Sequence, residues 1–371
     1  MKRIILVTLT VLLVSAIIFG GCAKPTEPTE PTEPTEPVKP IEWRYESFVP
    51  PSDCFSIDAV DWAKGLEEAT DGRLKMTFFF AQSLVKLQGE FDAVVSGTCD
   101  MGTPVPYYTP ERLPLSSAAI VTLFAYTHQV QEGKTYCALV DKYKELRDEF
   151  LPTRVAWWQA PPPDSLIISN GKQVKTMEDL KGLKIRISSA QLVEAFKLMG
   201  AAPVVIPVPD VYHALETGVV DAASSEPNEF YLWKNYETTK YRTVMGGTAG
   251  RGFPTLVNID SYNKLPDDIR RIFDEQTDMW ERTILINEGH EEFIKESLQK
   301  ILEYDRTVGN PPWYVLPDAE RERWKQAAQP VNEETITRLE EKGLPGRAFC
   351  EDAIAFGQQY LDPAFLQLKY E

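Results

Sequence analysis

The sequence predicts an α/β protein with two similar lobes, and three observations lead to this prediction. Residues 176–227 alternate between strand and helix patterns, in the order strand, helix, strand, helix, strand, which is typical of one α/β lobe with parallel strands. The run from Ala93 to Gly102 resembles the run from Ala214 to Ala223, because each has a helix end, a glycine and a strand with an aspartate. About 330 residues follow the N-terminal segment, enough for two cores.

The chain begins with a predicted secretion signal. Lys2 and Arg3 form a short basic region, residues 4–19 form an almost unbroken apolar run, and Gly20-Gly21-Cys22 follows. A cysteine directly after small residues resembles a bacterial lipobox, which predicts a signal peptide over residues 1–21 and a lipid anchor on Cys22. The alternative is an uncleaved membrane anchor, because the apolar run is only slightly shorter than the ~20 residues of a membrane span. Both interpretations place the rest of the chain outside the cytoplasm, in the periplasm or at the cell surface.

Residues 22–41 contain a Thr-Glu-Pro repeat, which predicts an extended acidic spacer without a core. The whole chain has 55 acidic and 39 basic residues and a formal net charge of -16. This surplus argues against a basic groove, so no nucleic-acid partner is expected. It also makes any inward-facing arginine informative, because an anionic ligand needs local positive charge.

The first lobe is predicted over residues 42–160 and 248–266. Strands are expected at residues 43–49, 74–80, 99–101 and 155–158, and helices at 56–69, 90–95 and 136–150, each from its apolar spacing and flanking turn residues. Three prolines at 161–163 break regular structure and predict a crossing to the second lobe. The strand at 255–258 predicts a second crossing.

The second lobe is predicted over residues 161–247 and 267–371. Strands are expected at 166–169, 183–187, 204–208 and 219–221. Ser188-Ser189 is a suitable helix start and Gly200 a suitable helix end, and a short helix is expected at 210–218. A long helical region at 267–302 and helices at 318–328, 331–341 and 348–361 complete the lobe.

No motif of a catalytic or metal site is present. The chain lacks a nucleophile elbow, a zinc-protease motif, a phosphate-binding loop and a dinucleotide fingerprint. We therefore expect no catalytic residue, metal or cofactor. The four remaining cysteines have no C-x-x-C spacing, and free buried thiols are favoured over the three possible disulfide connectivities; they are Cys54, Cys99, Cys137 and Cys350. An exported two-lobed chain of this kind is most simply a receptor that binds a solute between its lobes.

Arg186 is the leading ligand-binding candidate. Ligands of such sheets bind beyond the carboxyl ends of the parallel strands, and a guanidinium can make two hydrogen bonds to a carboxylate. A surface salt bridge is equally compatible with the residue pattern. Ser224 and Ser225 lie at another predicted strand end. The remaining candidates lie near predicted strand ends and loops: Phe48, Gln88, Tyr107, Trp158, Arg251 and Phe253.

Several blocks between Trp43 and Gln359 resemble one known family. They are DGRLKMTFFFAQSL, AVVSGTCDMG, TMEDLKGLKIR, MGAAPVVIPVPDVYHALETGVVDA and NIDSYNKLPDD. They resemble the DctP family, the solute-binding proteins of tripartite ATP-independent periplasmic (TRAP) transporters. The resemblance implies a two-lobed periplasmic-binding-protein-like fold, with a ligand cleft between the lobes and a long helix spanning both. It also implies that a small organic acid is delivered to a TRAP-type membrane permease, and that Arg186 clamps the ligand carboxylate.

The chain departs from the family pattern at two places. Many members have G-Q-E-N after the Val-Asp pair, and the 2-oxo-acid group has A-E-W, whereas this chain has Ala222-Ala223-Ser224-Ser225-Glu226. This difference argues against a cation bound with the ligand. Ser165 stands where sialic-acid binders have a second arginine, which favours a monocarboxylate. Arg251 is a candidate for a substitute charge, and a solvent-exposed loop arginine is equally compatible with its position. The alternatives are a receptor for an ABC transporter or a sensor, and an extracellular hydrolase, for which no motif is present.

Overall fold

The structure, a computed structural model, describes residues 39–119, 126–188, 190–247, 250 and 252–361. The predicted signal peptide, the predicted lipidation site Cys22, nearly all of the predicted spacer and the candidate Arg251 lie outside these residues. The chain divides into two units, Met1–Lys39 and Pro40–Glu371. The fold below is that of the second unit.

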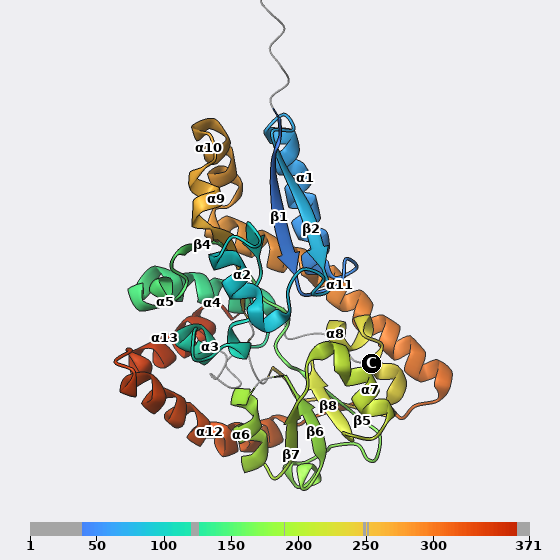
Figure 1. Ribbon diagram of the computed structural model, residues 1–371. Helices are drawn as coiled ribbons and strands as arrows, with labels where there is room; N and C mark the ends of the chain where they lie inside the picture. Colours follow the sequence, from blue (N-terminus) through green and yellow to red (C-terminus); the bar gives the residue numbers. More distant parts are fainter. Residues whose placement is uncertain (1–38, 120–125, 189, 248–249, 251, 362–371) are drawn as a thin grey trace, which may run out of the picture. The chain divides into compact units, whose positions relative to one another are not determined.

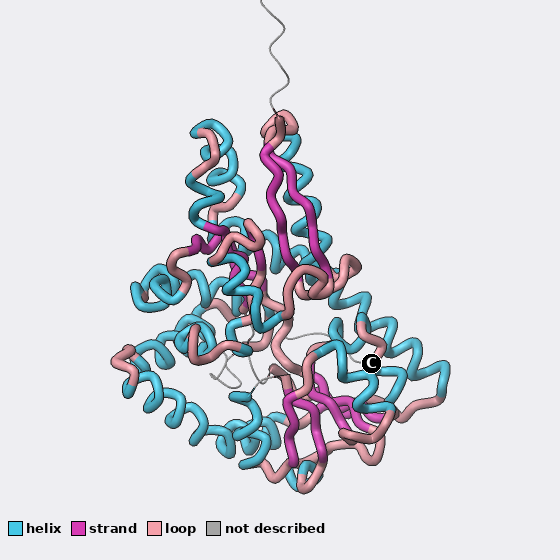
Figure 2. Tube along the Cα trace, in the orientation of Figure 1, coloured by secondary structure: helices cyan, strands magenta, loops and turns pink. Residues whose placement is uncertain are grey.

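Two β-sheets organise this unit, and Figure 2 shows their strands in two separate groups. The first sheet has the order β2-β1-β3-β10-β4 and the second β11-β9-β5-β8-β6-β7. We call each sheet with its covering helices a lobe. The strands of the first lobe are β1 (Ile41–Ser47), β2 (Leu74–Phe80), β3 (Met101–Gly102), β4 (Thr153–Gln159) and β10 (Phe253–Asn258). Those of the second are β5 (Leu166–Ser169), β6 (Lys184–Ile187), β7 (Ala202–Val205), β8 (Ala222–Ser225), β9 (Tyr241–Val244) and β11 (Tyr314–Val315).

The two sheets share one arrangement of strands. In the first lobe β2, β1 and β3 are parallel, and β10 and then β4 continue the sheet in antiparallel pairing. In the second lobe β7, β6 and β8 are parallel, followed by antiparallel β5 and β9. Gly97 and Gly218 precede the equivalent strands β3 and β8, with positive φ of 71° and 74°, which a glycine adopts without steric cost. The internal repeat predicted from the sequence is therefore present.

The aspartates of this repeat have equivalent contacts. Asp100 accepts a hydrogen bond from the backbone N–H of Arg44 at 2.7 Å, and Asp221 accepts one from the N–H of Lys184 at 3.3 Å. In return, the backbone N–H of each aspartate donates to the carbonyl of the same residue of the neighbouring strand. Asp100 thus holds the middle of β1 beside β3, and Asp221 holds the start of β6 beside β8.

The chain crosses between the sheets at the two predicted places. Strand β4 of the first sheet is followed by β5 of the second, with the three prolines between them, and β9 of the second is followed by β10 of the first. The second crossing is tightly packed, because a Cβ atom at Gly252 would lie only 2.3 Å from the Tyr136 ring. Glycine is required there by close approach.

Helices surround both sheets (Figure 1). The long helix α11 (Met279–Val308) packs against α4 and β4 of the first lobe and against α8 of the second, so the expected helix spanning both lobes is present. The other helices are α1 (Cys54–Ala69), α2 (Glu90–Val95), α3 (Pro114–Ala118), α4 (Gln129–Lys142), α5 (Lys144–Glu149), α6 (Ala190–Leu198), α7 (Val211–Glu216), α8 (Pro227–Leu232), α9 (Ile259–Asn263), α10 (Asp267–Gln276), α12 (Asp318–Glu341) and α13 (Gly346–Gln359).

Several predicted element bounds were wrong. The helical region at 267–302 is two helices, because the chain breaks at Thr277 and Asp278 caps α11 through the backbone N–H of Glu281 at 2.9 Å. The helices predicted at 318–328 and 331–341 are one helix, α12, which contains Pro330. A proline usually ends a helix, but Ala328 and Val331 on either side are both buried in one hydrophobic cluster, and their packing holds α12 continuous.

The other differences concern segment ends and helix placement. Residues 136–150 form α4 and α5, with α4 starting earlier, at Gln129; the strands predicted at 204–208 and 219–221 lie at 202–205 and 222–225. Helices α10 and α13 pack on α1 and α4 of the first lobe, whereas the prediction grouped residues 267–371 with the second. Helical spacing of apolar residues shows that a helix is amphipathic but not which sheet it covers.

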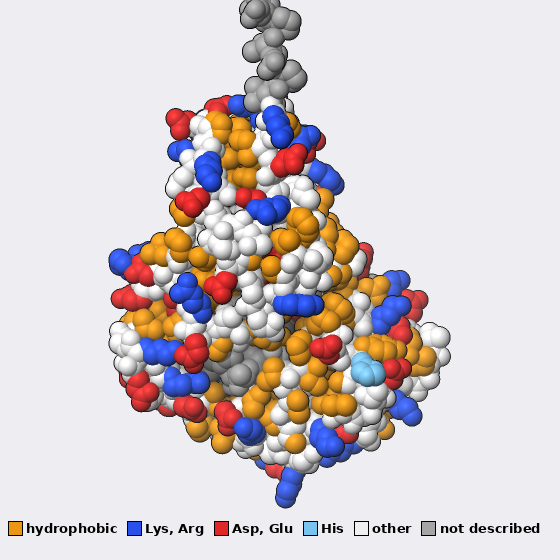
Figure 3. All heavy atoms as spheres, in the orientation of Figure 1, with side chains coloured by type: hydrophobic (Ala, Val, Ile, Leu, Met, Phe, Trp, Pro, Cys, Tyr) orange, Lys and Arg blue, Asp and Glu red, His pale blue; other side chains and the backbone are white. Residues whose placement is uncertain are grey.

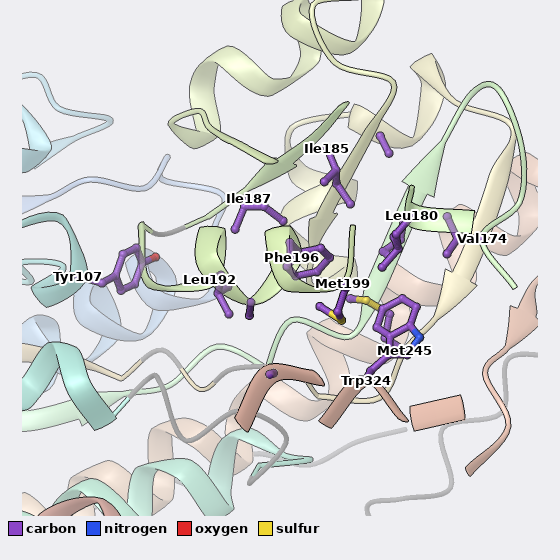
Figure 4. Packing of buried hydrophobic residues seen from close by; sticks show 14 of the residues in the cluster. Tyr107, Val174, Leu180, Ile185, Ile187, Leu192, Phe196, Met199, Met245 and Trp324 are labelled. Carbon is purple, nitrogen blue, oxygen red and sulfur yellow. The ribbon is translucent and has the colours of Figure 1, made fainter. Parts of the chain in front are cut away.

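One hydrophobic cluster contains side chains from both lobes. Figure 4 shows part of it: Ile187, Leu192 and Phe196 of the second lobe, with Tyr107 of the first lobe among the labelled residues. Trp324 of α12 is fully buried in the same cluster. The lobes are therefore in direct apolar contact.

The charged side chains of one face and the cysteines are described next. On the face shown in Figure 3, basic and acidic side chains are interspersed rather than gathered in a basic patch. The four cysteines outside the signal region are buried and free, as predicted. Within the described ranges, no helix is both long and apolar enough to cross a membrane.

Candidate ligand-binding site

A pocket lies between elements of the two lobes and holds about 590 Å³ of space not filled by protein atoms, including the part open to solvent. Its lining combines aromatic and polar residues, which we call its aromatic side and its polar side. The aromatic residues are Phe48, Phe55, Tyr107, Tyr108, Trp233 and Phe253, and the polar ones are Asp53, Gln82, Glu226, Asn228 and Glu229.

Phe253, the first residue of β10, is the centre of the aromatic side. Phe48 and Phe55 meet its ring edge-on, with centroids 5.5 Å and 6.0 Å away, and Tyr107 lies at 6.2 Å. Edge-to-face contacts of this kind add to the stabilisation from burial. The rings therefore form a wall of fixed shape against which an apolar or aromatic ligand can pack.

Arg186, near the end of β6, lies behind the polar side of the pocket. Its side chain is fully buried. Nε donates to the carbonyl of Ile206 at 2.9 Å, and Nη1 donates to the carbonyl of Ser224 at 3.2 Å and to Glu229 Oε1 at 2.8 Å. Nη2 is buried and has no hydrogen-bond partner among the described residues. A buried donor of a charged group left in this way is costly, and it indicates a position for an acceptor.

The Arg186 guanidinium stays charged. Burial by itself lowers its pKa, but the Glu229 carboxylate and nearby phenolic and acidic groups raise the pKa above its ordinary value. Burial raises the pKa of Glu229, and the Arg186 charge partly opposes that rise. The two groups form a buried ion pair at the pocket wall, because Glu229 lines the pocket and Arg186 supports it.

Acceptors from both lobes complete the polar side. Asp53 caps α1 by accepting from the backbone N–H of Phe55 at 2.9 Å, and burial raises its pKa to about 6. Glu226 follows β8 in the second lobe and accepts from Ser225 Oγ at 2.8 Å. Asn228 is 3% exposed, and its Oδ1 has no partner among the described residues.

The predicted site residues fall into three groups. Phe48, Tyr107 and Phe253 line the pocket together. Arg186, Ser224 and Ser225 lie directly behind it, since Ser224 and Ser225 contact Arg186 and Glu226 as described above. Of the remaining predictions, Gln88 and Trp158 do not line the pocket, and nothing is described for Arg251.

The structure explains why Gln88 and Trp158 do not line the pocket. Gln88 is exposed on the short 3-10 helix Leu87–Gly89, and its neighbour Leu87 lines the pocket instead. Trp158 is fully buried in the first-lobe core, where it stacks on Tyr136 at 4.4 Å. Arg251 lies outside the described residues.

The sequence analysis did not predict the five polar residues of the pocket: Asp53, Gln82, Glu226, Asn228 and Glu229. Asp53 had a signal, because an aspartate just before an apolar helix is a typical N-cap. Glu229 and Asn228 carry no such signal, since they lie on the helix after β8, and their direction depends on how that helix packs. Among the described residues no group of three or more His, Cys, Asp or Glu is placed to hold a metal ion.

Comparisons with known proteins agree with this architecture. The profile of the DctP family, described as bacterial extracellular solute-binding protein, family 7, matches residues 45–338. A C4-dicarboxylate-binding periplasmic protein of Rhodobacter capsulatus is 26% identical over 302 residues, 80% of this chain and 86% of that protein. A monocarboxylate 2-oxoacid-binding periplasmic protein of Nostoc is 28% identical over 249 residues, 64% of this chain and 65% of that protein.

Solved structures show the same fold. A TRAP solute-binding protein of Rhodoferax ferrireducens, in complex with copurified benzoate, has a TM-score of 0.79 and 23% identity, and the match covers 86% of this chain and 98% of that one. A marine metagenome TRAP solute-binding protein specific for aromatic acids, in complex with 3-hydroxybenzoate, has a TM-score of 0.79 and 22% identity, covering 87% and 99%. The predicted two-lobed fold is confirmed, and the chain belongs to the DctP family of bacterial extracellular solute-binding proteins.

Proposed function

We propose that this chain is a lipid-anchored receptor that binds a small monocarboxylate with an apolar or aromatic body and delivers it to a TRAP-type permease. The observation that carries the proposal is Arg186: a charged, fully buried guanidinium behind the pocket-lining Glu229, with Nη2 unpaired among the described residues. A ligand carboxylate is the partner that best fits such a donor. The aromatic side of the pocket supports the choice of an apolar or aromatic body.

The relatives support the ligand class. The curated relatives bind a C4-dicarboxylate or a 2-oxo acid, and the structural neighbours hold benzoate or 3-hydroxybenzoate. All of these are organic acids. We further propose that Cys22 carries the lipid and that the residues after it form a spacer, so that the receptor stays near its permease.

The test is a thermal-shift screen of the purified receptor against monocarboxylates and dicarboxylates. A ligand present at 100 times its dissociation constant stabilises the protein by about 2.7 kcal/mol, which such a screen detects. We expect hits among aromatic and branched aliphatic monocarboxylates. The absence of any carboxylate hit would overturn the ligand class.

Variants of Arg186 then test the anchor. Arg186→Ala should weaken binding of the best acid by at least about a hundredfold, because breaking a buried ion contact on one side costs about 3–5 kcal/mol. Arg186→Lys should also weaken it, because an ammonium cannot reproduce the planar fork. Unchanged affinity in folded Arg186→Lys protein, measured by calorimetry, would show that the carboxylate binds elsewhere.

A further inference from the structure

We propose that Gln82 donates a hydrogen bond to the ligand, and that the ligand is therefore an acid with a second, uncharged oxygen acceptor, such as a carbonyl oxygen. This inference rests on the proposed function, in which Arg186 takes the carboxylate, and it names the ligand class more closely. Gln82 lines the pocket from the first lobe, just after β2, whereas Arg186 belongs to the second lobe. A ligand with both groups is held from both lobes.

Gln82 lies in an unusual turn at the end of β2. Ala81 and Gln82 both have positive φ, 53° and 62°, and the N–H of Ser83 donates to the carbonyl of Phe80 at 3.1 Å. Residues other than glycine, asparagine and aspartate rarely adopt this conformation, because their Cβ atom comes too close to the backbone. The turn therefore holds two side chains in a strained backbone conformation.

The turn at the other end of β2 shows that this strain is not required by the turn itself. Asp71 and Gly72 have a similar pair of positive φ values, 52° and 73°, and the N–H of Arg73 donates to the carbonyl of Thr70 at 3.0 Å. Asp-Gly is the sequence that such turns favour. Turn geometry alone thus does not account for a glutamine at position 82. Residues held in strained conformations cluster at binding and active sites.

The contacts of Gln82 fix the orientation of its amide. Its Oε1 accepts a hydrogen bond from the backbone N–H of Leu87 at 3.1 Å. Because a backbone N–H can pair only with the oxygen of an amide, the amino group takes the other position. Nε2 donates to none of the described residues, and since Gln82 lines the pocket, this donor is available to a ligand.

The turn is also tied to neighbouring residues of the pocket lining. The N–H of Ala81 donates to the carbonyl of Val49 at 3.1 Å, and both Val49 and Leu87 line the pocket. A donor that is positioned before binding loses little conformational freedom when the ligand arrives. The amide is uncharged, so a neutral carbonyl or ether oxygen suits it better than a second carboxylate, which pairs most strongly with a cation.

The experiment compares acids of nearly equal shape that differ in one carbonyl oxygen. Calorimetry on the purified receptor would pair 4-oxopentanoate with 4-methylpentanoate, and 3- and 4-acetylbenzoate with the 3- and 4-isopropenylbenzoates. The two ring positions provide different distances between the carboxylate and the acceptor. In at least one pair we expect the carbonyl acid to bind about fivefold or more tightly, as for one neutral hydrogen bond.

Variants of Gln82 test the assignment to this side chain. Gln82→Glu keeps the acceptor for the N–H of Leu87 but removes the donor, so the preference for the carbonyl acid should be lost. Gln88→Glu is the matched control, because it places the same charge on an exposed residue of the same loop that does not line the pocket, and it should leave the preference unchanged. Gln82→Gly is a second variant that adopts positive φ without strain, and it should lose the preference as well; thermal unfolding verifies that each variant folds.

The outcomes separate this inference from the proposed function. Equal binding within every pair by the unmodified receptor would overturn the second acceptor and leave the carboxylate receptor standing. A preference that both Gln82→Glu and Gln82→Gly leave intact would also overturn it. An equal loss of affinity for both members of a pair in Gln82→Gly would show that Gln82 contacts the part that the two acids share. Failure of all these acids to bind would overturn the inference, while the broader acid screen would decide the proposed function by itself.

Discussion

The side chain of Arg186 has a structural task and a proposed binding task, and these can be separated by mutation. The guanidinium holds two backbone carbonyls and Glu229, all through Nε and Nη1. Its Nη2 takes no part in these contacts. Removal of Arg186 alone would leave a buried carboxylate without its counter-charge, so a simple loss of binding could reflect loss of the fold.

A double variant separates the effect of Arg186 on stability from its proposed effect on ligand binding. Arg186→Met should lower the free energy of unfolding by about 3–5 kcal/mol, because Glu229 remains buried and unpaired. Arg186→Met with Glu229→Gln should recover much of that loss but none of the affinity for an acid. Denaturant unfolding and calorimetry measure the two effects. As a control, Arg347→Met removes an exposed ion pair with Glu333 and should change neither the stability nor the affinity. If the double variant recovered its affinity for the acid, the proposed role of Arg186 in binding would be wrong.

Among the elements, the crossing segment before β10 depends on close packing. Gly252→Ala would place a methyl group about where the Tyr136 ring lies, since the Cβ position is 2.3 Å from a ring carbon. Overpacking of this kind costs about 1–3 kcal/mol, so the melting temperature should fall. Gly289→Ala in α11 is the matched control, because a Cβ there meets nothing within 4 Å, and alanine should stabilise the helix by about 0.5–1 kcal/mol. Equal stability of both variants in a thermal melt would contradict the packing at Gly252.

Helices and strands were predicted correctly where local sequence signals define them, and incorrectly where packing between distant residues decides. β2 and α2 have the predicted bounds, because their apolar spacing and flanking turn residues are local signals. Helix α12 was predicted as two helices, because Pro330 is a local signal for a break and the packing of Ala328 and Val331 is not local. The same reason applies to α10 and α13, whose apolar faces are clear in sequence but whose partner lobe is not.

For the whole molecule, buried carboxyl groups make stability depend on pH. Burial raises the pKa of Glu46 and of Glu149, each to about 7. Since an unfolded glutamate has a pKa of 4.5, the folded protein binds more protons than the unfolded chain between about pH 4.5 and 7. The contribution of these groups is therefore fully present below about pH 4.5 and is lost as the pH rises through about 7.

Glu46→Gln tests this dependence, because glutamine resembles the protonated form at every pH. The variant should gain stability relative to the unmodified protein as pH rises from 5 to 8, by up to about 3 kcal/mol for a pKa difference of this size. Urea unfolding at several pH values measures the difference. The exposed Glu216→Gln serves as the control and should run parallel to the unmodified protein. A constant difference for Glu46→Gln across the range would show that Glu46 does not titrate on folding.

Local patterns in the chain were enough to predict the α/β class and the internal repeat, and to single out Arg186 as a candidate. Each of these depends on residues close together in sequence, such as a helix end, a glycine and an aspartate before a strand. The composition of the pocket depended on tertiary structure. Asp53 and Glu226 are far apart in the chain and belong to different lobes. Glu229 of α8 pairs with Arg186 of β6 across 43 residues of sequence. Contact between the lobes brings Asp53 and Glu226 to one pocket, and long-range packing within the second lobe gives Arg186 its buried partner.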